Sequence, residues 1–81
     1  MGLTVGPRIV HGYSTILGLI PLEYPVLGLP PGQSAEIRTY AGDPHWRILR
    51  IKNGVSSGWY GFYATAKAAL AALQDQLDAG G

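Results

Sequence analysis

The stretch that decides the fold runs from residue 46 to residue 78 and reads WRILRIK (46–52), NGVSSG (53–58), WYGFY (59–63), AT (64–65) and AKAALAALQDQLD (66–78). Its first and third parts are rich in β-branched and aromatic residues, which favour strands. Asn53-Gly54 between them is the strongest short signal for a hairpin turn. We therefore expect a strand over 46–52, a return strand from Ser57 or Gly58 to Tyr63, and a helix after it.

The expected helix has recognisable ends. Thr65 is a good N-cap residue, because its hydroxyl accepts a hydrogen bond from a backbone N–H of the first turn, and Gly80 favours termination. Strong helix formers fill the segment between them. One narrow apolar stripe at helical spacing comprises Ala66, Leu70, Leu73 and Leu77. This pattern predicts a C-terminal helix over 65–79 that packs its stripe on a sheet.

The residues before this stretch predict more strands. Residues 35–40 are expected to form a strand that joins the 46–52 strand through a loop over 41–45, whose Gly and Asp-Pro suit a turn. Residues 1–34 are apolar and rich in Pro and Gly. Within them we expect short strands, at 8–13, 14–20 and 26–29, with the prolines marking turns.

These segments belong together in one domain over 1–81, because a chain of 81 residues is too short for a second core. Residues 1–34 supply strands and turns, 35–63 antiparallel strands, and 65–79 the helix. The predicted class is α+β, with an antiparallel sheet of three to five strands packed against one C-terminal helix.

Alternation along the strands sorts the side chains onto two faces. The sorting assumes that the hairpin loop after residue 52 has an even number of residues and that the loop over 41–45 has five. The predicted core face then comprises Ile37, Thr39, Leu49, Ile51, Tyr60 and Phe62, with Arg47 at its edge. The opposite face is aromatic and cationic, and the candidate binding surface on it comprises Arg38, Tyr40, Trp46, Arg50, Lys52, Trp59 and Tyr63. A one-residue bulge in 55–58 would change this sorting.

Composition narrows the class of protein. Six Lys and Arg oppose five Asp and Glu, so the net charge of +1 is unlike the strong basic field of a dedicated duplex-DNA binder. Charged residues make up only 14% of the chain, against roughly 25% in typical domains. Part of the surface must then be apolar, which favours a partner. The chain has no secretory signal and no apolar run long enough to span a membrane, so we expect a cytoplasmic protein.

Local motifs for chemistry are absent from the sequence. There is no nucleophile elbow, phosphate-binding loop or dinucleotide fingerprint. The chain has no cysteine, and two histidines, His11 and His45, supply at best half a first-row metal site. We therefore expect no enzyme activity, no cofactor and no metal. A small enzyme or ligand pocket around His45 and Asp43 is kept as a minor alternative.

The function predicted from the sequence is a small non-enzymatic binding protein, in the manner of bacterial or phage accessory proteins. Its candidate surface would bind a protein partner or a second copy of the chain. The alternative of a different class is a single-stranded nucleic-acid binder, in which Trp and Tyr rings stack on bases while Arg and Lys hold phosphates. A third possibility is structural: the apolar residues 1–34 would cover this face, and Trp46 and Trp59 would then pack in the core.

The run from Gly58 to Leu73 resembles the strand-to-helix passage of the peptidoglycan-binding sporulation-related repeat. Those domains need a second strand–helix unit, which this sequence lacks. The resemblance therefore implies only the strand-then-helix ending of a sheet-plus-helix fold.

Overall fold

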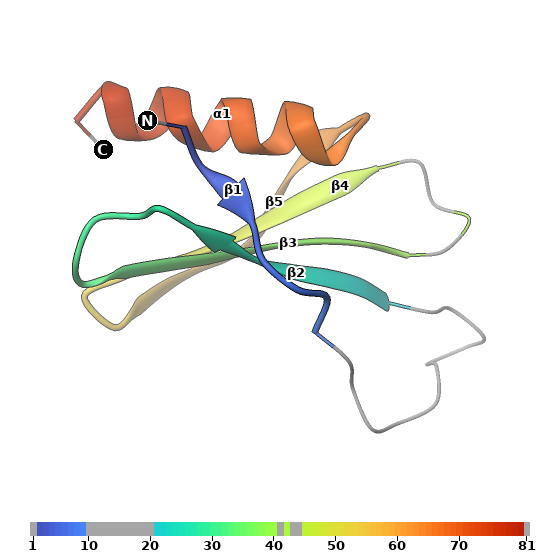
Figure 1. Ribbon diagram of the computed structural model, residues 1–81, viewed down its shortest axis with the longest axis horizontal. Helices are drawn as coiled ribbons and strands as arrows, with labels where there is room; N and C mark the ends of the chain where they lie inside the picture. The colour runs from blue at the N-terminus through green and yellow to red at the C-terminus, as the bar shows by residue number, and fades with distance from the viewer. Residues whose placement is uncertain (1, 10–20, 41, 43–44, 81) are drawn as a thin grey trace.

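A computed structural model of the chain describes residues 2–9, 21–40, 42 and 45–80. The described elements are, in chain order, β1 (Thr4–Val5), β2 (Pro21–Leu27), β3 (Gln33–Tyr40), β4 (Trp46–Lys52), β5 (Val55–Tyr63) and α1 (Ala66–Asp78). Each strand pairs antiparallel with the next, so the spatial order β1-β2-β3-β4-β5 follows the chain (Figure 1). The predicted α+β class, with a five-stranded antiparallel sheet and one C-terminal helix, is confirmed.

The hairpin between β4 and β5 forms at the predicted turn. Lys52 pairs with Val55, which leaves Asn53 and Gly54 as a two-residue loop. Both have positive φ angles, 53° and 81°, and Asn and Gly are the residues that tolerate this backbone conformation best. The return strand therefore starts at Val55, two or three residues before the predicted start at Ser57 or Gly58.

The helix begins and ends as expected. Thr65 Oγ1 accepts a hydrogen bond of 3.0 Å from the Ala68 N–H, so Thr65 is the N-cap of α1. At the other end Gly80 has a φ of 83°, and its N–H donates to the Leu77 carbonyl over 3.0 Å. This left-handed residue satisfies one of the carbonyl groups that the helix leaves without an internal partner.

The prolines of β2 lie inside a strand instead of marking turns, as the sequence had suggested. The carbonyls of Glu23 and Pro25 accept hydrogen bonds from Ile9 and Gly6 on the β1 side, each of 2.8 Å. In a strand, the N–H and C=O of one residue point to the same side. Because Pro21 and Pro25 have the same parity as Glu23, the N–H groups they lack would face β1 and not β3. The full ladder from β2 to β3 therefore forms.

Other expectations for the N-terminal part have mixed outcomes. The strand expected over 26–29 begins at Pro21 and ends at Leu27. Of the strand expected over 8–13, Ile9 makes a single bridge to Glu23. Residues 10–13 of that strand, and the whole strand expected over 14–20, lie outside the described part of the chain. No helix in the described ranges is long and apolar enough to cross a membrane.

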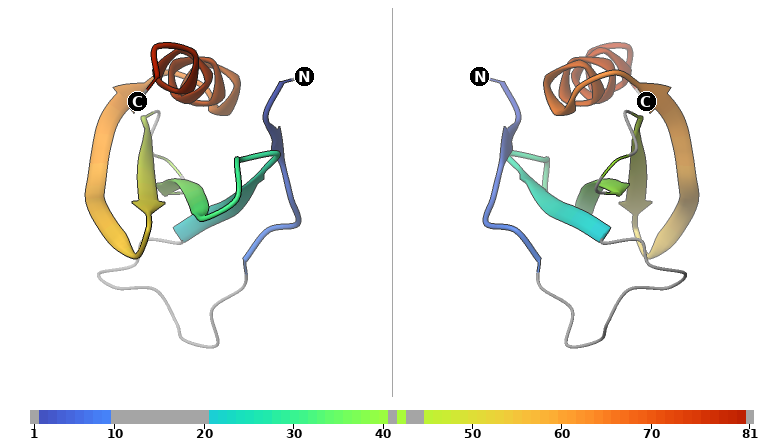
Figure 2. Two further views of the ribbon diagram at one scale, coloured as in Figure 1. Left: turned by 90° about the vertical axis from the view of Figure 1, so that its left-hand side faces the viewer. Right: turned by 90° about the vertical axis from the view of Figure 1, so that its right-hand side faces the viewer.

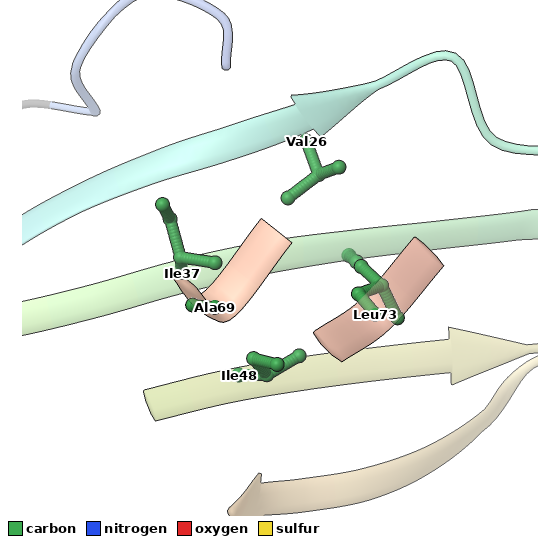
Figure 3. Close-up of a cluster of buried hydrophobic side chains, with 6 residues drawn as sticks. Val26, Ile37, Ile48, Ala69 and Leu73 are labelled. Carbon is green, nitrogen blue, oxygen red and sulfur yellow. The ribbon is translucent and has the colours of Figure 1, made fainter. Parts of the chain in front are cut away.

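The sheet is curved, and α1 lies against its concave face. In the end-on views of Figure 2, the outer strands rise on either side of the helix. The core between the two layers comprises Val26, Ala35, Ile37, Ile48, Ala69 and Leu73. Figure 3 shows side chains of these residues from β2, β3, β4 and α1 pointing toward one another. Around them, half-buried aromatic side chains that include Tyr24, Trp46, Tyr60 and Tyr63 complete the apolar layer.

The predicted sorting of side chains onto faces is wrong at two places, and the first is the loop between β3 and β4. Ile37 pairs with Ile48, and Arg38 pairs with Arg47. The predicted register would have placed Ile37 opposite Leu49, so β4 is offset from it by one residue. A one-residue change of register moves every side chain of a strand to the opposite face. As a result Ile48, and not Leu49, joins Ile37 beneath the helix.

The second difference arises from two irregularities in the pairing of β5. Register shifts lie between Leu49 and Ile51 and between Trp46 and Ile48, so β5 carries an extra residue at each. The first shift falls in the segment where a bulge had been considered. The second includes Gly61, whose φ is 92° and whose added Cβ would collide with the ring of Tyr63. The absence of a side chain at Gly61 therefore leaves room for the Tyr63 ring.

Candidate functional site

The sheet face turned away from α1 carries a cluster of charged and aromatic side chains, which we call the outer face. It comprises Glu23, Arg38, Tyr40, Arg47, Trp59 and Phe62. These residues come from four strands and reach one surface because of the register described above. No helix in the described part of the chain packs on this face. It is therefore the candidate surface for function.

Arg38 is the centre of the outer face. Its guanidinium carbon lies 4.0 Å from the ring centroid of Trp59 and 5.4 Å from that of Tyr40. Its Nη1 also donates to Glu23 Oε1 over 3.3 Å. The side chains of Arg38 and Glu23 are 24% and 9% exposed, so this ion pair is largely shielded from water. Two rings and one carboxylate together hold the guanidinium in one position.

A second stack lies beside the first one. The ring of His45 is parallel to the ring of Phe62, with centroids 3.8 Å apart and an interplanar angle of 6°. The Arg47 guanidinium carbon lies 5.2 Å from the centroid of the same phenyl ring. Phe62 nevertheless remains 64% exposed. This part of the outer face therefore presents an aromatic ring to solvent.

The two stacks have a common cause in the pairing of β3 and β4. Arg38 and Arg47 are directly opposite each other, and like charges in this position repel. Each guanidinium lies over a ring of β5, and Glu23 adds a negative charge next to Arg38. The aromatic residues of β5 and the carboxylate of β2 thus stabilise a pair of cations that the register forces together.

The structure divides the seven residues of the predicted binding surface. Arg38, Tyr40 and Trp59 lie together on the outer face. Trp46 and Tyr63 pair with each other on the opposite face, where both pack against the core beneath α1. The Trp46 ring there lies 6.0 Å from the ring of Tyr24.

Arg50 and Lys52, the other two residues of the predicted surface, lie at the hairpin end of β4. Arg50 Nη2 donates to Gln33 Oε1 over 2.9 Å, on the face that carries α1. Together with Val55, Ser56 and Ser57, the two cations line an open hollow of about 300 Å³. They are therefore separated from the outer-face aromatics with which they had been grouped.

Sequence reasoning missed three members of the outer face. Glu23 had no predicted role, Arg47 was placed at the edge of the core face, and Phe62 was assigned to the core. No local signal points to Glu23, because its partner Arg38 is 15 residues away in the chain. For Phe62 the signal was present, since Gly61 next to it marks the second bulge.

The structure describes part of the region around His45 and Asp43, where the sequence allowed a small enzyme site or ligand pocket as a minor alternative. His45 is half-buried, and its carbonyl accepts a hydrogen bond of 2.7 Å from Thr39 Oγ1. Asp43 and His11 lie outside the described residues. Within residues 2–9, 21–40, 42 and 45–80, no three His, Cys, Asp or Glu side chains are grouped in a way that would hold a metal ion.

Comparison with known proteins adds no family to this description. No protein-family model, curated protein or solved structure gives a significant match to the chain. The candidate site is therefore interpreted from its own geometry.

Proposed function

We propose that this chain is a small non-enzymatic binding protein that contacts a protein partner through its outer face. The observation that carries the proposal is the position of Arg38, stacked 4.0 Å from the Trp59 ring and ion-paired to Glu23. Trp, Tyr and Arg are the residue types that dominate binding energy at protein interfaces. Side chains held in place before binding lose little conformational entropy when a partner arrives.

The charge of the outer face favours a protein over a nucleic acid as the partner. The described strands contribute two cations to this face, Arg38 and Arg47. Two carboxylates, those of Glu23 and Glu36, belong to the same side of the sheet, because side chains alternate along each strand. The two signs therefore balance. Single-stranded nucleic acid is bound by an excess of positive charge along a groove. Arg50 and Lys52, which would have supplied that excess, lie at the hairpin end on the other side.

The test begins with capture of a partner on the immobilised full chain, followed by calorimetry with the purified partner. Trp59→Ala and Phe62→Ala should each weaken binding at least about tenfold, because truncation removes a ring from the centre of the contact. Val55→Ala is the matched control. Val55 is apolar and 71% exposed, yet it lies at the hairpin and away from the outer-face stacks. Its replacement should leave the affinity unchanged.

Three results would contradict the proposal. The first is a loss of affinity in Val55→Ala as large as that in Trp59→Ala and Phe62→Ala. The second is a purified partner that binds Trp59→Ala as tightly as it binds the unchanged chain. The third is quenching of tryptophan fluorescence by a single-stranded oligonucleotide with a steep dependence on salt. That dependence is expected when phosphate contacts dominate, and it would favour the nucleic-acid alternative.

A further inference from the structure

The two edges of the sheet differ in their capacity to pair with another strand. β5 pairs with β4 on one side, and among the described residues no strand pairs with its other side. β5 is nine residues long and contains neither a charged residue nor a proline. Charges and prolines are the usual means by which proteins keep a free edge from pairing. Among the residues that the structure describes, the two bulges of β5 are the protection that this edge carries.

The opposite edge is closed to pairing over most of its length. β1 consists of Thr4 and Val5 alone, and Gly6 and Pro7 follow directly. The next strand, β2, lacks two N–H groups on the same side because of Pro21 and Pro25. Within the described part of the sheet, β5 is therefore the edge that is open to pairing, and a second copy added there leaves no comparable edge from which a fibre could grow.

At Trp59, the middle residue of β5, the backbone N–H and C=O point toward the free edge. The Arg50 N–H donates to Ser57 Oγ, so Arg50 faces β5 and its neighbour Leu49 faces β3. Trp59 is opposite Leu49, in a pair that exchanges no hydrogen bonds across β4 and β5. The N–H and C=O of Trp59 consequently point outward. Trp59 is also equidistant from the strand ends Val55 and Tyr63.

We propose that the β5 edge pairs antiparallel with the β5 edge of a second copy, about a two-fold axis at Trp59. Such pairing is isologous, because each Trp59 supplies one donor and one acceptor to the other. Strand addition at a free edge is a common mode of association. The uncharged strand brings no like charges together at the axis. The two bulges flank Trp59 and shorten the contact, so we expect a dimer whose formation depends on concentration.

The first experiment measures the mass of the full chain by sedimentation velocity, from low micromolar to millimolar concentration. The expected result is a monomer that converts to a dimer and to no larger species. Amide hydrogen exchange by NMR provides the local readout. The Trp59 amide should exchange at least about tenfold more slowly at the high concentration, because it then donates to the second copy.

A semisynthetic variant with a methyl group on the backbone nitrogen of Trp59 tests the geometry directly. The methyl group removes the outward donor and blocks the edge, while the side chain and the contacts with β4 stay as they are. This variant should be monomeric at every concentration and retain the circular dichroism of the unmodified chain. The control carries the same methyl group on Ala66, the first helical residue, whose N–H has no acceptor within the helix. It should dimerise normally.

Four results would overturn the inference, and none of them depends on the partner proposed for the outer face. They are a monomer at all concentrations, an assembly that grows beyond two copies, a Trp59 amide that exchanges at the same rate throughout, and a dimer that survives methylation of Trp59.

Discussion

Arg38 shows how much one side chain contributes to the outer face. It contacts a residue of β2 and a residue of β5, and it lies opposite a residue of β4. The predicted binding surface placed Lys52 on the same face as Trp59, as a second cation near the ring. Trp59 instead pairs with Leu49, and Lys52 pairs with Val55.

A double-mutant cycle measures the contact between Arg38 and Trp59. We expect the single changes Arg38→Met and Trp59→Leu, and their combination, to reveal a coupling of about 0.5–2 kcal/mol in the free energy of unfolding. The measurement is urea unfolding followed by circular dichroism. A parallel cycle with Lys52→Met and Trp59→Leu serves as the control and should give no coupling. A larger coupling to Lys52 than to Arg38 would show that the stack is misplaced.

Among the elements, α1 and the hairpin were the most predictable. Thr65, Gly80 and the Asn53-Gly54 turn each act through atoms a few residues away, and all three function as expected. β2 was not predictable, because two prolines favour turns locally. Only the position of β1 explains why they are tolerated.

The N-cap of α1 gives a prediction at the scale of the element. Thr65→Ala removes the acceptor of the Ala68 N–H and should lower the free energy of unfolding by about 1 kcal/mol. Thr65→Ser retains a hydroxyl at the same place and should restore most of that loss. Thermal or urea unfolding by far-ultraviolet circular dichroism measures both. Equal stability of the two variants would mean that the hydroxyl does not cap the helix.

For the whole molecule, stability rests on the small core between the sheet and α1. Leu73 is fully buried there, whereas Leu27 near the β1 edge is 48% exposed. Leu73→Ala should therefore lower the free energy of unfolding by about 2–5 kcal/mol, through lost burial and the cavity left behind. Leu27→Ala should change it by less than about 1 kcal/mol. Chemical unfolding compares the two, and similar losses would contradict the assignment of the core.

At the same scale the two tryptophans have different roles. The sequence left open whether they pack in the core or form a binding surface, and it placed them on one face. Trp46 belongs to the layer beneath α1, and Trp59 belongs to the outer face. The candidate site is consequently smaller and less basic than the predicted surface of seven residues. It keeps Arg38, Tyr40 and Trp59, and Glu23, Arg47 and Phe62 take the place of the other four.

The amino-acid sequence alone determined the strand-rich runs, the hairpin turn, the ends of the helix and the fold class. Those features depend on residues that are near one another in the chain, where propensity and capping act. The tertiary structure alone decided which side chains share a face and which charges meet. A one-residue offset between β3 and β4 and two extra residues in β5 reverse the faces, and the ion pair of Glu23 and Arg38 joins strands that only the folded sheet brings together.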